Sequence, residues 1–183
     1  GLLTGGTNLV AESPVVEAET IAQAHDLAKA CEYLTGLPDP AASASAFHSL
    51  VRRSWQMKNV PAMIQYGQAG IQFALQTSAK LGDGEAKLAT QLRGLAKSIA
   101  YDVSSNLWPG WGEPGITLNA TDLAIGLQLA RTNLRLAREL DRKGAPLGHA
   151  WWLLGAHELA SRNHTAAVAA FETAQAEYAD DYA

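Results

Sequence analysis

A pair of short motifs near the C-terminus constrains the fold of this chain more than any other part of the sequence. Each motif places three residues at intervals of three or four: Trp151, Leu154 and Gly155 in the first, then Ala167, Phe171 and Ala174 in the second. Residues at this spacing share one face of an α-helix. The motifs therefore predict two helices packed face to face, because small residues let the helix axes approach and aromatic rings fill the space beside them.

The arrangement W-x2-L-G, a polar turn, then A-x3-F-x2-A resembles the tetratricopeptide repeat, a helix hairpin of about 34 residues that stacks on further hairpins. The second half of the signature recurs at Ala62-x3-Tyr66-x2-Ala69 and at Ala130-x3-Leu134-x2-Ala137. The chain departs from the family at Glu158, where the pattern favours Tyr, and at Ala179, where it favours Pro. The resemblance implies an all-α fold of about seven helices, stacked as antiparallel hairpins in a short right-handed array. An irregular helical bundle is the alternative.

In the tetratricopeptide family the first helix of each hairpin lines a concave groove that holds the partner. Carried over to this chain, the resemblance places five residues in that groove: His48, Arg52, Trp55, His149 and Trp152. It thus implies a non-enzymatic protein–protein interaction scaffold that binds a peptide or partner helix in an aromatic groove.

Caps and helix breakers divide the chain into helices. Pro14 after Ser13 favours a helix start and Gly36 a stop, so we expect one continuous helix over residues 14–35. Further helices are expected from the Pro-Asp-Pro turn at 38–40 to about 58, over 61–81, 85–106 and 120–143, and on either side of residue 162. Residues 1–13 are expected to form a flexible lead-in, and residues 14–183 a single domain without strands.

The segment from Leu107 to Gly115 interrupts this helical pattern with two prolines and three glycines. Long loops between helices are often functional, and tryptophan is favoured at binding surfaces. Trp108, Trp111 and Glu113 are therefore a second candidate site, in which a pocket under the loop would hold a small molecule. Alternatively, both indole rings fold back and close the end of the helical stack.

A basic stripe is expected on the helix that begins near residue 120. Its members recur every three or four residues: Arg131, Arg135, Arg138 and Arg142. The stripe is either a solvated outer face or a docking surface for an anionic partner.

Composition limits the remaining function classes. The 183 residues are 48% apolar and 17% charged with a net charge of −4, which favours a folded protein without a general attraction to nucleic acid. No apolar run is long enough to span a membrane. Cys31 stands alone, and the five histidines form no metal-binding pair, so we expect no metal, no cofactor and no catalytic residues. The sequence leaves the partner's identity, the oligomeric state and the choice between cytoplasm and export open.

Overall fold

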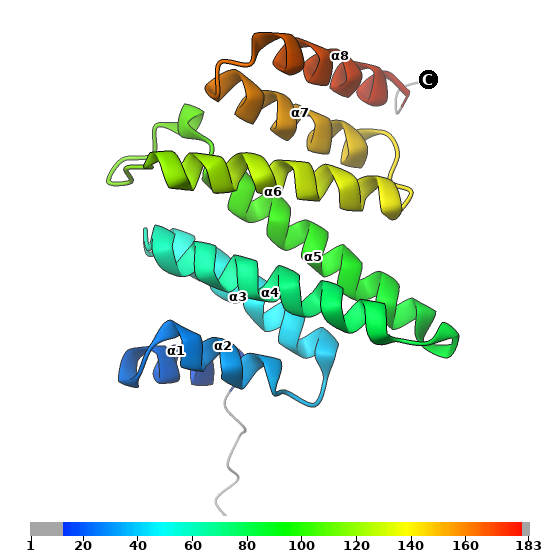
Figure 1. Ribbon diagram of the computed structural model, residues 1–183. Coiled ribbons are helices and arrows are strands. Elements are labelled where there is room, and N and C mark those ends of the chain that lie inside the picture. The colour runs from blue at the N-terminus through cyan, green and yellow to red at the C-terminus, as the bar shows by residue number, and fades with distance from the viewer. Residues whose placement is uncertain (1–12, 181–183) are drawn as a thin grey trace, which may run out of the picture.

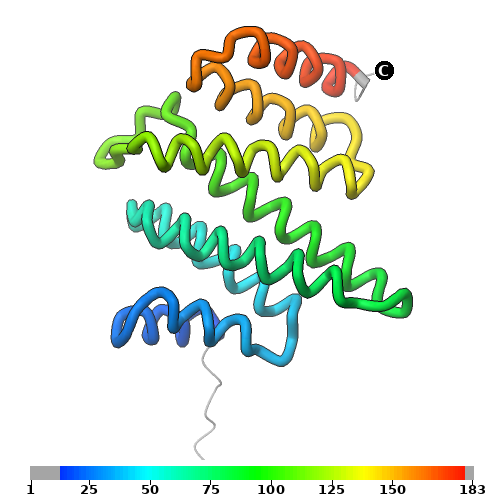
Figure 2. The backbone as a smooth tube through the Cα atoms, viewed as in Figure 1, coloured from blue at the N-terminus to red at the C-terminus, as the bar shows by residue number. Residues whose placement is uncertain are grey.

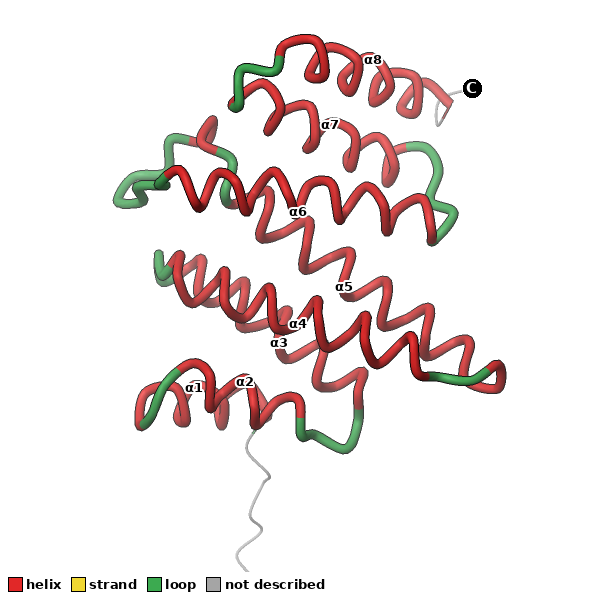
Figure 3. The backbone as a smooth tube through the Cα atoms, viewed as in Figure 1, coloured by secondary structure: helices red, strands yellow, loops and turns green. Residues whose placement is uncertain are grey.

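The computed structural model describes residues 13–180, and within that range all the regular secondary structure is helical. Eight α-helices and two short 3-10 turns follow one another: α1 (Pro14–Ala24), α2 (Leu27–Thr35), α3 (Pro40–Gln56), α4 (Val60–Lys80), η1 (Asp83–Glu85), α5 (Ala86–Asn106), η2 (Pro109–Trp111), α6 (Ala120–Glu139), α7 (Ala145–Ala160) and α8 (His164–Asp180). The helices lie in chain order, with α1 and α2 at one end of the stack and α8 at the other (Figures 1 and 3). The prediction of an all-α fold without strands is confirmed for these residues.

The prediction of one continuous helix over residues 14–35 is wrong, and this accounts for the eighth helix. The first helix ends at Ala24, and its C-cap residue His25 leaves the helical region at φ −129° and ψ −95°. Asp26 then begins α2, because its carboxylate accepts a hydrogen bond from the backbone N–H of Lys29 at 2.8 Å. An Asp that caps a new helix competes with continuation of the old one.

Three of the turns contain a non-glycine residue in the left-handed region: Lys58, Asp141 and Arg162. Helix α6 was expected to reach about residue 143 but ends at Glu139, because Asp141 takes φ 51° and reverses the chain. The backbone N–H of Arg142 then bonds the carbonyl of Ala137 at 2.9 Å, which satisfies one of the last carbonyls of the helix. The helix start expected at Ser13 is present, and Asn119 caps α6 through a capping box with Asp122.

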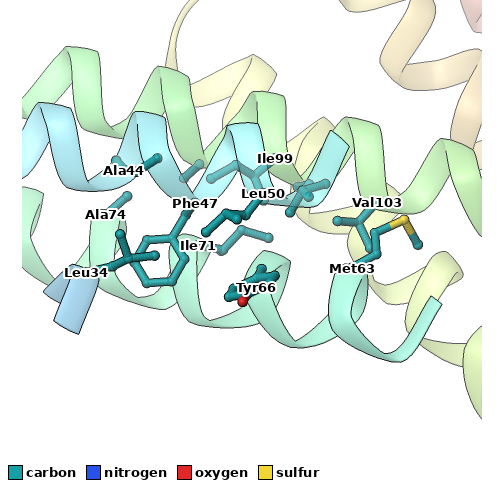
Figure 4. Packing of buried hydrophobic residues seen from close by; sticks show 14 of the residues in the cluster. Leu34, Ala44, Phe47, Leu50, Met63, Tyr66, Ile71, Ala74, Ile99 and Val103 are labelled. Atoms are coloured by element: carbon teal, nitrogen blue, oxygen red, sulfur yellow. The ribbon is translucent and has the colours of Figure 1, made fainter. Parts of the chain in front are cut away.

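The main hydrophobic core lies where α3, α4 and α5 meet. Its largest fully buried side chains include Phe47, Met63 and Ile99, one from each helix (Figure 4). Helix α4 comes close to both neighbours through Gly67 and Gly70. A Cβ atom at Gly67 would lie 2.6 Å from Val103 of α5, and one at Gly70 would lie 2.7 Å from Phe47 of α3. In the α3–α4 hairpin the glycines that allow close approach therefore lie on α4, the second helix.

The predicted close contact in the C-terminal hairpin is present. A Cβ atom at Gly155 of α7 would lie 2.8 Å from the ring of Phe171 on α8. Ala167 and Ala174 are buried beside it, each about 2% exposed. A smaller cluster at the α6–α7 interface contains Leu134, Ala137 and Ala150, with Trp151 and Leu154 packed against it. The C-terminal motif therefore describes two interfaces of α7, one with α6 and one with α8.

The course of α5 brings two distant connections together. This helix crosses the stack obliquely, so the loop that follows it reaches the same edge of the molecule as the α3–α4 turn (Figure 2). Trp55 near the end of α3 and the tryptophans of the α5–α6 loop consequently line one cavity. This edge holds the candidate site.

Candidate functional site

The α5–α6 loop is an ordered structure built around its tryptophans. Pro109–Trp111 forms the 3-10 turn η2, which Gly112 ends in the left-handed region at φ 57°. The Trp108 ring folds over Gly110 so closely that a Cβ atom at that position would collide with it. The glycines thus have specific roles, one allowing the chain reversal and the other making room for an indole ring.

Three contacts hold this loop against the helices. The indole N–H of Trp111 donates a hydrogen bond to the carbonyl oxygen of Ser105 at 2.8 Å. Lys58, in the α3–α4 turn, donates from Nζ to the carbonyl oxygen of Pro114 and lies 3.6 Å from Glu113 Oε1. These contacts connect the loop to both α5 and the α3–α4 turn, so the positions of its tryptophans are defined.

The tryptophans form a contiguous aromatic group. The rings of Trp108 and Trp111 lie nearly perpendicular, at 86°, with centroids 5.0 Å apart. Trp108 also contacts Trp152 of α7, with ring centroids 5.5 Å apart at 75°. Edge-to-face contacts of this kind are favourable because the positive edge of one ring meets the negative face of the other. Trp108 is thereby fixed from two sides, whereas Trp111 remains 54% exposed.

A cavity of about 250 Å³ opens beside this aromatic group, between the ends of α3 and α5 and the start of α6. Of the described residues that line it, Glu113 is the only one with a charged side chain. The lining residues are Trp55, Asn106, Trp108, Pro109, Trp111, Gly112, Glu113, Ile116, Thr117, Leu118 and Leu123. The cavity is thus an aromatic and aliphatic hollow with a few polar groups, as small binding sites commonly are.

A second, more polar hollow of about 260 Å³ adjoins the first and shares Trp55 and Asn106 with it. Its lining contains two charged residues, Asp102 of α5 and Arg52 of α3. The Asp102 Oδ2 lies 2.8 Å from Nε2 of His48 and 3.9 Å from Nε of Arg52. The Asn106 amide has only a weak sulfur acceptor, Met63 Sδ at 3.7 Å. The wall between the hollows therefore carries hydrogen-bonding groups that a ligand could use.

The structure brings most of the two predicted sites to one place. Trp55 lines the aromatic cavity and Trp152 supports it through Trp108, while His48 and Arg52 lie around Asp102 at the neighbouring hollow. His149 does not join them. Its ring packs against Tyr178 of α8, with centroids 5.4 Å apart.

The four arginines of the predicted basic stripe engage different partners. Arg131 pairs with Glu158 at 2.8 Å, Arg135 pairs with Glu139 at 2.6 Å, and the Arg138 guanidinium lies 4.7 Å from the centre of the Trp151 ring. Arg142 lines a separate hollow of about 590 Å³ near the α6–α7 turn. An anionic docking surface made of all four arginines stays a prediction, and three of them already have partners within the chain.

Sequence reasoning missed several polar residues. Asp102 and Asn106 lie on α5, and no pattern connects them to Trp55, which is about fifty residues away. Glu158, identified only as a departure from the repeat pattern, is buried and accepts hydrogen bonds from Arg131 at 2.8 Å and Asn163 at 3.0 Å. The one sequence signal for the Glu158–Arg131 pair was the presence of a charged residue, Glu158, on an otherwise apolar helix face. Asn133 of α6 is fully buried without a hydrogen-bond partner for its amide.

A buried histidine also joins α5, α6 and α7. His157 Nε2 donates to the carbonyl oxygen of Ser104 at 2.9 Å, and the Ser104 hydroxyl donates to the carbonyl oxygen of Gly126 at 2.8 Å. Burial lowers the pKa of His157 below its ordinary value of 6.5, because the charged imidazolium would lose its hydration. This histidine is therefore neutral at physiological pH and holds the helices together.

Cys31 of α2 is a free cysteine and is partly buried. Burial raises the pKa of the Cys31 thiol to about 11, so the reactive thiolate is scarce at neutral pH. Within residues 13–180, no three His, Cys, Asp or Glu side chains gather in a way that could hold a metal ion. None of the helices in this range combines the length and apolar character needed to cross a membrane.

Comparison with protein-family models, with curated proteins and with solved structures found no match to this chain. The functional interpretation consequently rests on the geometry of the site.

Proposed function

We propose that this protein is a non-enzymatic interaction module, and that it binds a partner peptide or helix by taking one of the partner's side chains into the aromatic cavity. The observation that carries this proposal is Trp111, which is 54% exposed yet held at the cavity by a hydrogen bond and an edge-to-face contact. An exposed tryptophan in a fixed position is typical of the residues that dominate binding energy in interfaces. A fixed ring also loses little conformational entropy when a partner binds.

The size of the cavity favours a side chain over a whole ligand. Pockets for drug-sized molecules usually enclose about 300–1,000 Å³. The aromatic cavity, at about 250 Å³, lies below that range. The adjoining hollow supplies Asn106, Gln56 and Ser105, which suit the backbone amides of a peptide continuing past its anchor residue. A small-molecule binding protein with its pocket under the same loop is the second candidate function, and the cavity's aromatic walls favour it.

We also propose that the helices stack as tetratricopeptide-like hairpins. The contact of Gly155 with Phe171 supports this for α7 and α8, and the burial of Ala62, Tyr66, Ala130 and Ala137 supports the two echoes of the signature. In this arrangement Trp55 and Trp152 come from the first helices of two hairpins.

Selection from a random peptide library displayed on phage tests the proposed function. The wild-type protein serves as bait, and Trp111→Ala and Trp55→Ala are counter-baits. Leu159→Ser is the matched control, because it removes an apolar side chain that is 46% exposed on α7, outside the cavity lining. We expect enriched peptides that share one anchor residue, bind wild type and Leu159→Ser equally, and lose at least about tenfold in affinity with either cavity variant.

Two outcomes would contradict the proposal. Peptides that bind the cavity variants as well as wild type would place the site elsewhere. Failure to enrich any peptide, together with thermal stabilisation by compounds from a small-molecule library that Trp111→Ala abolishes, would establish the second candidate function instead. All baits should first show equal helicity by circular dichroism, so that loss of binding reports on the site.

A further inference from the structure

We infer that Trp55, Trp108 and Trp111 form an aromatic cage whose ligand is an alkylammonium cation. The shared chemistry is a positively charged nitrogen carrying alkyl groups, supplied either by a lysine or methylated lysine side chain of a peptide or by a free quaternary amine. The inference rests on the proposed binding site and names the group that the site recognises.

The ring geometry is the first reason. Indole faces carry negative electrostatic potential and attract cations within about 6 Å of the ring centre, tryptophan more strongly than other aromatic residues. Trp108 and Trp111 stand at 86° to one another and so make two walls of a corner, and Trp55 lines the same cavity from α3. A compact cation in this corner would contact more than one ring.

The charge of the cavity is the second reason. Of the described residues that line it, Glu113 alone carries a charge, and that charge is negative. Lys58 pairs with Glu113 at 3.6 Å from outside the cavity lining and also donates to the carbonyl oxygen of Pro114. In the adjoining hollow the carboxylate of Asp102 is accompanied by a guanidinium, because Arg52 lines the same hollow with its Nε 3.9 Å from Asp102. The charged side chain that the described residues place in the cavity lining is therefore a carboxylate, and at this lining it favours a cation over an anion.

A pair of probes with the same shape separates a cage from an ordinary apolar pocket. Choline carries a trimethylammonium group, and 3,3-dimethylbutan-1-ol replaces its nitrogen with carbon. Titration of ¹⁵N-labelled protein with each compound would be followed through the indole N–H resonances, one for each of the five tryptophans. We expect choline to shift the signals of Trp55, Trp108 and Trp111 and to bind about three- to thirtyfold more tightly than its neutral isostere. The Trp151 signal should not move.

A second arm identifies the source of the cation. The probes are the peptide Gly-Ser-Lys-Ser-Gly with blocked ends, its trimethyllysine form, and the form in which that nitrogen is replaced by carbon. A trimethyllysine peptide that binds more tightly than choline would assign the site to a peptide side chain. A free amine is the assignment if choline binds as tightly as the peptide. Both results support the cage, because in each case the charged form binds more tightly than its neutral isostere.

Variants test the two parts of the recognition separately. Trp111→Leu keeps an apolar surface but removes a π face, and Glu113→Gln keeps the shape but removes the charge. Each should reduce the preference for choline over its isostere by about threefold or more. Trp151→Leu and Glu172→Gln make the same chemical changes outside the cavity lining and should leave the preference unchanged.

The inference is overturned if the neutral isostere binds as tightly as choline, or if neither compound shifts the three cavity tryptophans. Phage-selected peptides that still require Trp111 would then uphold the proposed binding function with an uncharged anchor. Loss of both the probe binding and the peptide selection would remove the proposed function as well.

Discussion

At the scale of single residues, glycines set how closely the helices approach. Gly155 lies against Phe171 with no room for a side chain, whereas a Cβ atom at Gly94 of α5 would meet nothing within 4 Å. The same residue type is therefore required at one position and costs stability at the other, because a helical glycine loses more conformational freedom on folding than alanine does.

This contrast gives the first prediction. Gly155→Ala should lower the free energy of unfolding by about 1–3 kcal/mol, because the added methyl group must displace the Phe171 ring. Gly94→Ala should raise it by about 0.5–1 kcal/mol. Urea denaturation followed by circular dichroism measures both. Equal effects of the two substitutions would show that the α7–α8 contact is looser than its geometry indicates.

Buried His157 gives the second prediction, which concerns pH. Burial lowers the pKa of His157 below its ordinary value of 6.5. As the pH falls, the imidazole is therefore protonated in the unfolded chain before it is protonated in the folded chain. The free energy of unfolding should therefore fall as the pH drops below about 6.5. His157→Gln should weaken this dependence, whereas His25→Gln, at an exposed position, should leave it unchanged. Parallel pH-dependence curves for wild type and His157→Gln would contradict the assignment.

At the scale of elements, side-chain caps decide where helices begin. The chain has a continuous helical pattern over residues 14–35, yet Asp26 divides it by capping α2. The hydrophobic spacing cannot reveal such a division, because α1 and α2 both bury apolar residues at helical intervals.

The third prediction addresses this cap. Asp26→Ala should lower the free energy of unfolding by about 1 kcal/mol, because the Lys29 N–H loses its acceptor. Asp26→Asn should retain most of the stability, since asparagine caps about as well as aspartate. Thermal denaturation of the two variants compares them directly. If the asparagine variant is as unstable as the alanine variant, then charge and not capping is the role of Asp26.

At the scale of the whole molecule, contacts connect helices that are neighbours in the stack. Helix α5 packs on α3, α4 and α6, whereas α8 packs chiefly on α7. The fully buried large side chains concentrate between α2 and α5, around Phe47 and Met63. A stack of this kind has a stable middle and less protected ends, because each end helix is covered on one side only.

The fourth prediction follows from this arrangement. Amide hydrogen exchange measured by mass spectrometry should be slowest in α3, α4 and α5 and faster in α1 and α8. Phe47→Ala should lower the protection of the middle helices much more than that of α8, because the Phe47 side chain is fully buried in the main core. Uniform protection along residues 13–180, or an equal loss in every helix, would show that the molecule unfolds as one cooperative unit.

The sequence predicted the local features of this protein. Helical spacing, caps and breakers located the six helices α3 to α8 approximately, and the C-terminal motif identified the Gly155–Phe171 contact. These features depend on residues within a few turns of each other, so they can be predicted from the local sequence. The tryptophans of the α5–α6 loop were identified for the same reason, since a run of prolines and glycines cannot continue a helix.

Only the tertiary structure decided which residues of other helices lie opposite each helix face. Trp55 and Trp111 line one cavity because α5 carries its loop back to the α3–α4 turn, and Asp102 meets His48 for the same reason. Likewise Glu158 is tolerated in the α7 interior because α6 places Arg131 opposite it. Periodicity in a helix specifies which side is buried, but not which residues another helix will set against it. The site is made of such pairings, and therefore the fold class was predictable while the assembled cavity was not.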